Sequence, residues 1–242
     1  MSPDAVAEVI RARRTIKFRV DPDRALPPGD DSTRSLVEEL VDLGATAPHH
    51  FPCHSGHQQG PLDSPAPWRF HCMTGPACRR LMAYVLTLDG LVDKLAALLA
   101  AADGLILVTW LPDPPSSPLP ADSLFEPTRR NMEHVAGVAA AVQNMLLAAT
   151  AKGVETYWGS GGVFRRPAVA RRLGIGAHEV LLGAVFLFPT PDDAKGEVKP
   201  GARRRSAGPR DSWMRWVEAF EAPGTGGPAL ESDGTSPTLA DS

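Results

Sequence analysis

The chain has 242 residues, of which 43% are hydrophobic and 22% charged, and its formal net charge is −3 at pH 7. This length suffices for one well-packed core, and the slightly acidic balance excludes the bulk basic field with which many proteins bind nucleic acid. Three cysteines, an odd number in a chain of this size, indicate a reducing compartment rather than a disulfide framework.

The N-terminal third predicts two helices, a polar loop and a strand. Apolar residues that share one face indicate helices over residues 3–13 and 30–44. The N-terminus has no basic segment followed by an apolar run, so we expect no signal peptide and a cytoplasmic protein. Residues 48–66, rich in histidine, glycine and proline, are predicted as a loop, and residues 68–73 as a strand.

The middle of the chain predicts two long helices around one buried strand. A continuous apolar stripe indicates a helix over 76–101, and an unbroken apolar run of strand length indicates a central strand over 104–111. Residues 112–127 form a loop that begins rich in proline and serine. The longest helical pattern, 129–152, consists largely of alanine and contains two amide side chains, which favours a buried helix over a membrane span. We expect no membrane association.

The C-terminal part predicts two more strands, at 154–158 and 180–188, with a short helix at 167–173 between them. A basic arm follows at 189–209, and apolar residues predict a last helix over 211–220. Because strands and helices alternate along the chain, the sequence predicts an α/β or α+β fold with one mixed sheet.

These elements predict a single domain over residues 1–221, with loop insertions at 48–66 and 112–127. Residues 222–242 consist mainly of small and polar residues and offer little to bury. We therefore expect them to form a disordered tail.

The first candidate binding group is Arg13-Arg14-Thr15, at the end of the first predicted helix. An arginine fork suits a phosphate because its planar donors meet two oxygens at once, and a neighbouring hydroxyl adds a third donor. The alternative is a solvated helix end, where cations are favoured by the helix dipole.

Five potential metal ligands lie close together in the predicted loop: His49, His50, Cys53, His54 and His57. Nitrogen and sulfur ligands of this kind suit zinc, but the spacing matches no closed zinc site. Three interpretations remain open at this point: a metal site, a cofactor contact through His50, and histidines exposed to solvent.

The last two candidate groups are a glycine-rich turn and a basic run. Trp158, Gly159 and Ser160 follow a predicted strand, where glycines let backbone N–H groups approach a ligand closely. The alternative is an ordinary glycine-rich turn. Arg203 and Arg205, in the C-terminal arm, are either phosphate ligands or part of a solvated basic run.

Taken in order, four motifs carry a resemblance to a known family: Arg13-Arg14-Thr15, Ala47-Pro48-His49-His50, Pro67-Trp68-Arg69-Phe70, and the segment 157–161 after an alanine-rich helix. The chain resembles the nitroreductase superfamily, and within it most closely the small, minimal nitroreductase-like oxidoreductases. The resemblance implies an α+β fold of three layers, α/β/α, with one mixed, mainly antiparallel sheet. It also implies an intertwined homodimer with two FMN molecules at the subunit interface.

The resemblance also assigns roles to the candidate residues. Those implied to hold the ribityl phosphate and the ring edge are Arg13, Arg14 and Thr15, with Arg203 or Arg205 as a further phosphate ligand. Those implied to approach the same flavin from the other subunit are Thr46 and His50. Those implied to line the isoalloxazine pocket are Trp158, Gly159 and Ser160. Thr46 and Gly159 stand where close relatives carry arginine, and 51–66 is an insertion.

The function implied is that of an FMN-dependent oxidoreductase. It would pass two electrons from NADPH or NADH through the flavin to a nitroaromatic, a quinone or a similar small-molecule acceptor by a ping-pong mechanism. The flavin carries the chemistry, so we expect no catalytic protein residue, in agreement with the lack of any nucleophile motif. One alternative keeps the fold and FMN but has a specialised or lost redox activity; a second is a metal-binding protein that uses the His49–His57 loop.

Overall fold

The computed structural model describes residues 3–29, 32–90, 92–189, 197–200 and 208–217. The chain separates into two units, Met1–Ala202 and Arg203–Ser242. The helices of the first unit are α1 (Pro3–Ala12), α2 (Ser32–Ala45), α3 (Gly75–Val85), α4 (Asp93–Ala101), α5 (Arg129–Ala151) and α6 (Pro167–Arg172). Its strands are β1 (Ile16–Arg19), β2 (Trp68–Thr74), β3 (Gly104–Trp110), β4 (Glu155–Gly159), β5 (Val180–Phe188) and β6 (Glu197–Pro200).

A four-stranded sheet with the strand order β2-β3-β5-β4 forms the centre of the first unit. β3 is buried along its whole length, as its unbroken apolar sequence predicts. A second, smaller sheet pairs β1 with β6. Every strand pair in the described residues is antiparallel, so the parallel pairing of a mixed sheet is not among them.

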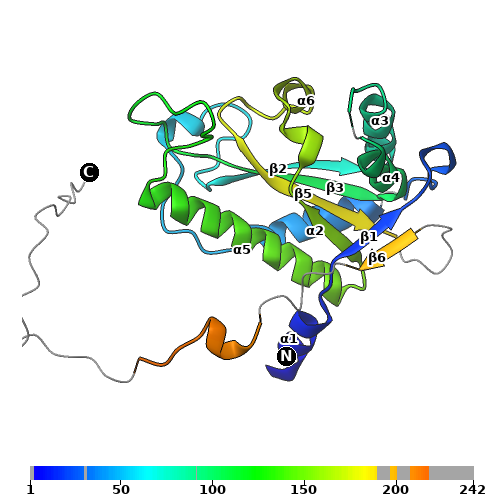
Figure 1. Cartoon of the computed structure of the whole chain (residues 1–242), viewed down its shortest axis with the longest axis horizontal. Coiled ribbons are helices and arrows are strands. Elements are labelled where there is room, and N and C mark those ends of the chain that lie inside the picture. The colour runs from blue at the N-terminus through cyan, green and yellow to red at the C-terminus, as the bar shows by residue number, and fades with distance from the viewer. Residues whose placement is uncertain (1–2, 30–31, 91, 190–196, 201–207, 218–242) are drawn as a thin grey trace, which may run out of the picture. The chain divides into compact units, whose positions relative to one another are not determined.

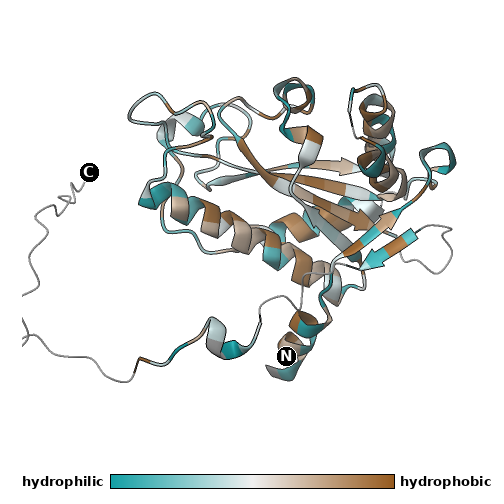
Figure 2. Cartoon of the chain, in the orientation of Figure 1, coloured by the Kyte–Doolittle hydropathy of each residue, from teal (hydrophilic) through white to brown (hydrophobic). Residues whose placement is uncertain are grey.

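Helices cover both faces of the four-stranded sheet, which gives the predicted three layers (Figure 1). α2 and α5 pack on one face, where Leu40 and Val142 meet Ile106 of β3. α3, α4, α6 and β1 pack on the other face, where Leu99 and Phe18 join the core. Figure 2 shows that hydrophobic residues are concentrated in the middle of the central sheet, where β3 is buried along its whole length. The predicted α+β class is confirmed.

α5 is the longest helix, and its alanine-rich sequence explains how closely it packs. The side chain of its N-cap Thr128 accepts a hydrogen bond from the Asn131 N–H. A Cβ atom on Gly44 of α2 would lie 2.8 Å from Met145 Cγ, so the two helices touch almost directly at this glycine. Within the described residues, α5 alone is long and apolar enough to cross a membrane, but 44% of its most apolar window is buried in this domain. α5 is thus a core helix of the domain.

The helix predicted over 76–101 is wrong: the chain forms two helices, α3 and α4, in that range. The break contains Gly90, whose φ of 103° places it in the left-handed region that glycine adopts without strain. Leu88 and Val92, both within the break, still pack against the same core, so the apolar periodicity continues through it. This is why periodicity alone predicted one helix.

Two further differences concern short or exposed segments. β1 and β6 were not predicted, because four residues give too short an alternation to distinguish a strand from a loop. β6 lies in the arm 189–209, which was predicted to be irregular. The helix predicted over 211–220 is wrong for the described part: a single 3-10 turn, Arg210–Ser212, is followed by irregular chain to Val217. Trp213 and Trp216 are exposed, so no buried face stabilises a helix there. Residues 222–242, predicted as a tail, lie outside the described residues.

Candidate functional site

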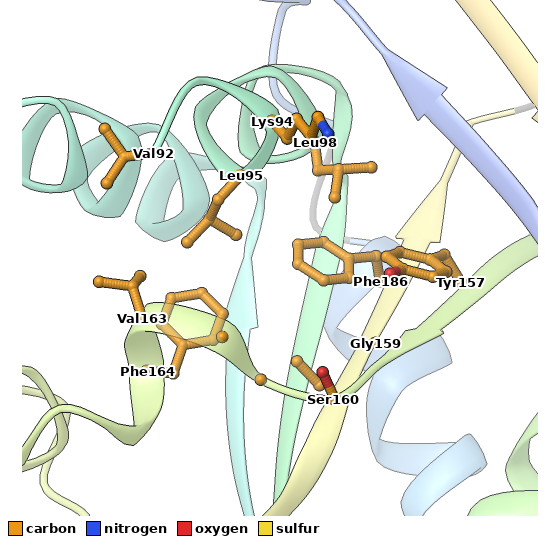
Figure 3. A pocket seen from close by; sticks show the side chains of 13 residues that line it. Val92, Lys94, Leu95, Leu98, Tyr157, Gly159, Ser160, Val163, Phe164 and Phe186 are labelled. Carbon is orange, nitrogen blue, oxygen red and sulfur yellow. The ribbon is translucent and has the colours of Figure 1, made fainter. Parts of the chain in front are cut away.

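A cavity of about 200 Å³ opens where α4, the end of β4, β5 and the 3-10 turn η3 (Gly162–Arg165) meet (Figure 3). Most of the side chains around it are apolar: Val92, Leu95, Leu98, Tyr157, Val163, Phe164, Ala184 and Phe186. Tyr157 and Phe186 are stacked, with their ring centres 5.8 Å apart and an angle of 20° between the planes. The cavity therefore has a flat aromatic wall, to which a planar ring can stack.

The backbone of residues 159–162 forms another side of the cavity. Gly161 and Gly162 have φ angles of 96° and 48°, which side chains rarely allow. A Cβ atom on Gly161 would also lie 2.5 Å from Leu181 Cδ2. The turn thus requires glycine at these two positions, and the structure places two predicted residues, Gly159 and Ser160, beside them at the cavity.

Trp158 does not line this cavity. Its indole nitrogen lies over Gly183 of β5, where an added Cβ atom would be 2.4 Å away, and the residue is 37% exposed. Successive side chains of a strand point to opposite faces, so Tyr157 and Gly159 share the cavity face while Trp158 points away. Tyr157 is thus a residue that sequence reasoning missed, although strand alternation identifies it.

Cationic residues lead from α1 along β1 to the aromatic wall. Lys17 Nζ lies 5.1 Å from the centre of the Tyr157 ring. Arg14 Nη2 donates to Glu155 Oε1 at 2.6 Å, and this hydrogen bond raises the pKa of Arg14. Arg13 and Thr15, on either side of Arg14, are half-buried. The predicted phosphate-binding group therefore lies beside the start of β4, and Lys17 joins it as a second residue that was missed.

The other predicted residues, Thr46 and His50, lie on the side of the sheet that α5 covers. Thr46, just after α2, donates its hydroxyl to the Leu43 carbonyl at 2.7 Å. His50 Nδ1 lies 2.9 Å from Glu133 Oε2 of α5. His50 and Glu133 border an open hollow of about 230 Å³, which also includes Pro48, His49, Ala136, Gly137 and Ala140. The predicted residues thus form two separate groups within one chain.

Comparisons with known proteins agree with this architecture. The family model described as Nitroreductase family matches residues 10–187. The chain belongs to the nitroreductase family. A comparison with curated protein sequences found no match.

Solved structures of the nitroreductase fold resemble the chain at low identity. The nitroreductase-like family protein from Bacillus cereus has 20% identity and a TM-score of 0.58, over 88% of this chain and 96% of that one. The NADPH:FMN oxidoreductase from Vibrio harveyi, complexed with NAD+, has 18% identity and a TM-score of 0.53, over 90% and 79%. A nitroreductase family protein from Clostridium novyi NT has 14% identity and a TM-score of 0.51, over 77% and 86%. These likenesses establish the fold.

The potential metal ligands in the histidine-containing insertion of this nitroreductase-family chain are not gathered into one cluster. His57 Nε2 hydrogen-bonds to the Pro112 carbonyl at 2.8 Å, and His54 Nδ1 accepts from the Gly56 N–H. Cys53 is buried, with its sulfur 3.6 Å from the Ser64 carbonyl oxygen. Among the described residues, which include all of 49–57, no three His, Cys, Asp or Glu side chains are placed to hold a metal ion. The described residues therefore give the metal-binding alternative no cluster of three ligands.

Arg69 fixes the insertion to the fold. This arginine is only 5% exposed, and its two terminal nitrogens donate to the backbone carbonyls of four residues: His57, Ser64, Ala66 and Trp68. Buried carbonyls with a charged donor are strongly favoured over unpaired ones. The insertion is therefore an ordered part of the domain.

A second buried polar cluster ties β2 and β3 to the chain before β5. Glu179 Oε2 accepts hydrogen bonds from His71 Nε2 at 2.8 Å and from the Thr109 hydroxyl, and its other oxygen accepts from the Gly176 N–H at 2.9 Å. Burial alone would raise the pKa of Glu179, but these hydrogen bonds together lower it to about 2. The carboxylate is thus charged at neutral pH and links three segments. Arg203 and Arg205 lie outside the described residues.

Proposed function

We propose that this chain is an FMN-dependent oxidoreductase that passes two electrons from NADPH or NADH to a nitroaromatic, a quinone or a similar small acceptor. The observation that carries the proposal is the aromatic cavity beside the cationic start of β1, in a chain of the nitroreductase family. The solved relative from Vibrio harveyi is an NADPH:FMN oxidoreductase, which supports the same cofactor pair here.

The chemistry of the cavity fits a flavin ring. The stacked Tyr157 and Phe186 offer a flat apolar face, and the glycine-rich turn offers backbone donors for the polar ring edge. The Lys17 ammonium at the Tyr157 ring adds a cation where the ring edge would carry negative charge. No acidic side chain is among the described residues that line the cavity. These features suit a ring that becomes anionic on reduction.

The start of β1 fits the phosphate of the same cofactor. Arg13, Arg14 and Thr15 immediately precede β1, and Arg14 is anchored beside Glu155, four residues before Gly159 on β4. Four strand residues span about 13 Å, so the cations lie at a distance from the ring site that a ribityl chain bridges. We therefore retain these three residues as the phosphate group, and Arg203 or Arg205 as a further candidate.

When bound, FMN would supply the hydride chemistry, and the protein residues would bind, orient and shield it. Backbone N–H groups of residues 159–162 and the Lys17 ammonium would stabilise negative charge at the ring edge. The apolar side chains of α4 and η3 would exclude water from the ring. NAD(P)H and the acceptor would use the same face of the bound ring in turn, as a ping-pong mechanism requires.

The two separate groups of predicted residues support a homodimer with two FMN molecules. A cavity of about 200 Å³ lies below the roughly 300–1,000 Å³ of typical ligand pockets, so one chain provides only part of a flavin site. In a two-fold dimer the hollow at His50 would close over the partner's cavity. Val6 and Ile10 of α1 are about half exposed and would be covered in the same interface.

The cytoplasm suits this function. Cys53, Cys72 and Cys78 are all free thiols in the structure, as a reducing compartment maintains them. We propose a cytoplasmic protein whose partners are its own second copy and a small-molecule electron acceptor, with no role for nucleic acid or membrane.

An absorption spectrum of the purified protein, followed by anaerobic titration with NADPH and with NADH, tests the proposal. A bound flavin that bleaches with either nucleotide supports it. A bound flavin that neither nucleotide reduces would favour a specialised reaction, which the absence of an arginine side chain at Thr46 and Gly159 makes a specific second candidate. Protein that binds no flavin would contradict both.

A further inference from the structure

His50 is held by a carboxylate on one side and open on the other. Its Nδ1 lies 2.9 Å from Glu133 Oε2, and a carboxylate only accepts, so Nδ1 is the donor. Arg129 Nε donates to the other oxygen of Glu133 at 3.1 Å. The carboxylate is therefore fixed from both sides and in turn fixes the imidazole ring.

The second nitrogen of His50 faces outward. The His50 side chain is 77% exposed, whereas Glu133 is only 17% exposed, and the described residues give Nε2 no hydrogen bond. Both side chains border the hollow of about 230 Å³ that begins at Pro48. A histidine with one nitrogen bonded to a carboxylate and the other open to a binding surface has the arrangement of a general acid–base group.

We propose that His50 donates a proton from Nε2 to the electron acceptor in the partner subunit's cavity, and that Glu133 positions it for this step. The inference rests on the proposed function and on the two-fold dimer. His50 is then a catalytic residue and Glu133 a positioning residue, although the sequence indicated no protein acid.

The proton from His50 completes the two-electron reduction of the acceptor. A quinone becomes a hydroquinone when it takes up a hydride equivalent and one proton, and a nitro group becomes a nitroso group and water by the same uptake. The two electrons come from NAD(P)H by way of the bound flavin. The proton leaves Nε2, the neutral imidazole keeps its Nδ1–H on Glu133, and water returns the proton to Nε2.

The charged and titratable groups around His50 favour this role. From α5, Glu133 Oε2 lies 2.9 Å from the His50 ring, and Arg129 pairs with the other oxygen of the same carboxylate at 3.1 Å. From the same loop, His49 also borders the hollow and sets its ring edge-on to Trp68, with ring centres 5.0 Å apart. The His50 hydrogen bond, with help from Arg129, lowers the pKa of Glu133, so the carboxylate stays charged.

The first test measures which ring nitrogen of His50 carries the proton, and it does not require enzyme activity. Long-range 1H–15N spectra of the full-length protein report which ring nitrogen of each histidine carries the proton, and His50→Gln assigns the signal. We expect neutral His50 in the Nδ1–H form, and a change to the Nε2–H form in Glu133→Gln. The same tautomer in both proteins would overturn the positioning role of Glu133.

The second test separates proton delivery from electron delivery. Menadione, a quinone, needs a proton on reduction, whereas ferricyanide takes electrons alone. A general acid contributes roughly 100-fold or more, so His50→Gln should slow reduction of menadione by the flavin about 100-fold and leave the ferricyanide rate unchanged. The menadione rate should fall with rising pH in the wild type and lose this dependence in the variant. Added imidazole should restore part of the rate in His50→Ala.

His54→Gln, on the same insertion but bonded to Gly56, is the matched control and should behave like the wild type. Equal losses with menadione and ferricyanide in His50→Gln, or no loss with either, would overturn the proposed proton donation by His50. If the flavin is still bound and reducible in that variant, the proposed function stands. A protein without bound flavin would overturn the proposed function, and the proton donor with it.

Discussion

The Lys17 ammonium lies 5.1 Å from the centre of the Tyr157 ring, and this contact joins β1 to the aromatic wall of the cavity. Residues 140 positions apart in the sequence are brought together here by the packing of β1 against β4. The contact places a cation against one of the two rings that form the aromatic wall.

Replacing Lys17 tests this relationship. Lys17→Ala should weaken FMN binding about tenfold or more, because a charge-assisted contact contributes roughly 1.5–3 kcal/mol and part of it is screened at this half-exposed site. Lys17→Arg should retain most of the affinity. Fluorescence titration with FMN measures both. Arg34→Ala, which removes an exposed cation on α2, is the control, and an equal loss there would show a general charge effect.

The arginine pair tests the phosphate assignment. Arg13→Ala with Arg14→Ala should lose FMN affinity by two orders of magnitude or more, since a phosphate dianion loses charge-assisted partners. Binding of riboflavin, which lacks the phosphate, should change little. Isothermal titration with both flavins gives the comparison, and a similar loss for FMN and riboflavin would refute a phosphate contact.

Part of this candidate site could be predicted from the sequence, because local patterns indicate it. Gly159 and Ser160 follow a strand with a glycine-rich turn, and the structure brings both to the cavity. Tyr157 could have been predicted as well, because side chains alternate along a strand, and Tyr157 rather than Trp158 shares the face of Gly159. Lys17 could not be predicted in this way, since its position depends on the packing of β1 against β4, which no local sequence pattern indicates.

The fold shows the same division. The continuous apolar run at 104–110 specifies a buried central strand without reference to the rest of the chain. By contrast, the break between α3 and α4 depends on how Gly90 and the Arg166 side chain, which donates to the Asp89 carbonyl, fit together in three dimensions. Apolar periodicity reports which residues are buried, and it does not report where the chain turns.

The glycine-rich turn at the cavity predicts how substitution of Gly161 changes the free energy of unfolding. Gly161→Ala should destabilise the protein by about 1–2 kcal/mol for the left-handed backbone, plus a clash with Leu181. Gly153→Ala, at a φ of 73° with open space around it, should show the backbone cost alone. Urea unfolding of both variants isolates the difference, and equal losses would mean that Leu181 does not restrict position 161.

The buried carboxylate of Glu179 predicts an acid-dependent loss of stability. Its pKa is lowered to about 2 in the folded protein from 4.5, so its contribution is present above pH 4.5 and is lost as the pH falls toward 2. That contribution is roughly 3 kcal/mol. Glu179→Gln should be less stable than the wild type at pH 7, and the difference should shrink below pH 4.5. Urea midpoints between pH 2 and 7 measure this, and a constant difference would contradict the lowered pKa.

Arg69 predicts how the insertion holds its shape. Arg69→Met removes the charged donor from four backbone carbonyls, one buried and three partly buried, and a carbonyl left without a partner costs roughly 1–3 kcal/mol unless water reaches it. The insertion should become sensitive to proteolysis between residues 51 and 66, while the rest of the domain resists. Limited proteolysis with mass spectrometry locates the cuts, and an unchanged pattern would show that other contacts order the loop.

The most direct measurement of the central claim is the flavin content of the purified full-length protein, read from its visible spectrum and followed during anaerobic addition of NADPH or NADH. We predict one FMN per chain in a dimer, with the flavin band bleached by one of the two nucleotides. A monomer that has no flavin and takes up none when FMN is supplied would contradict the account.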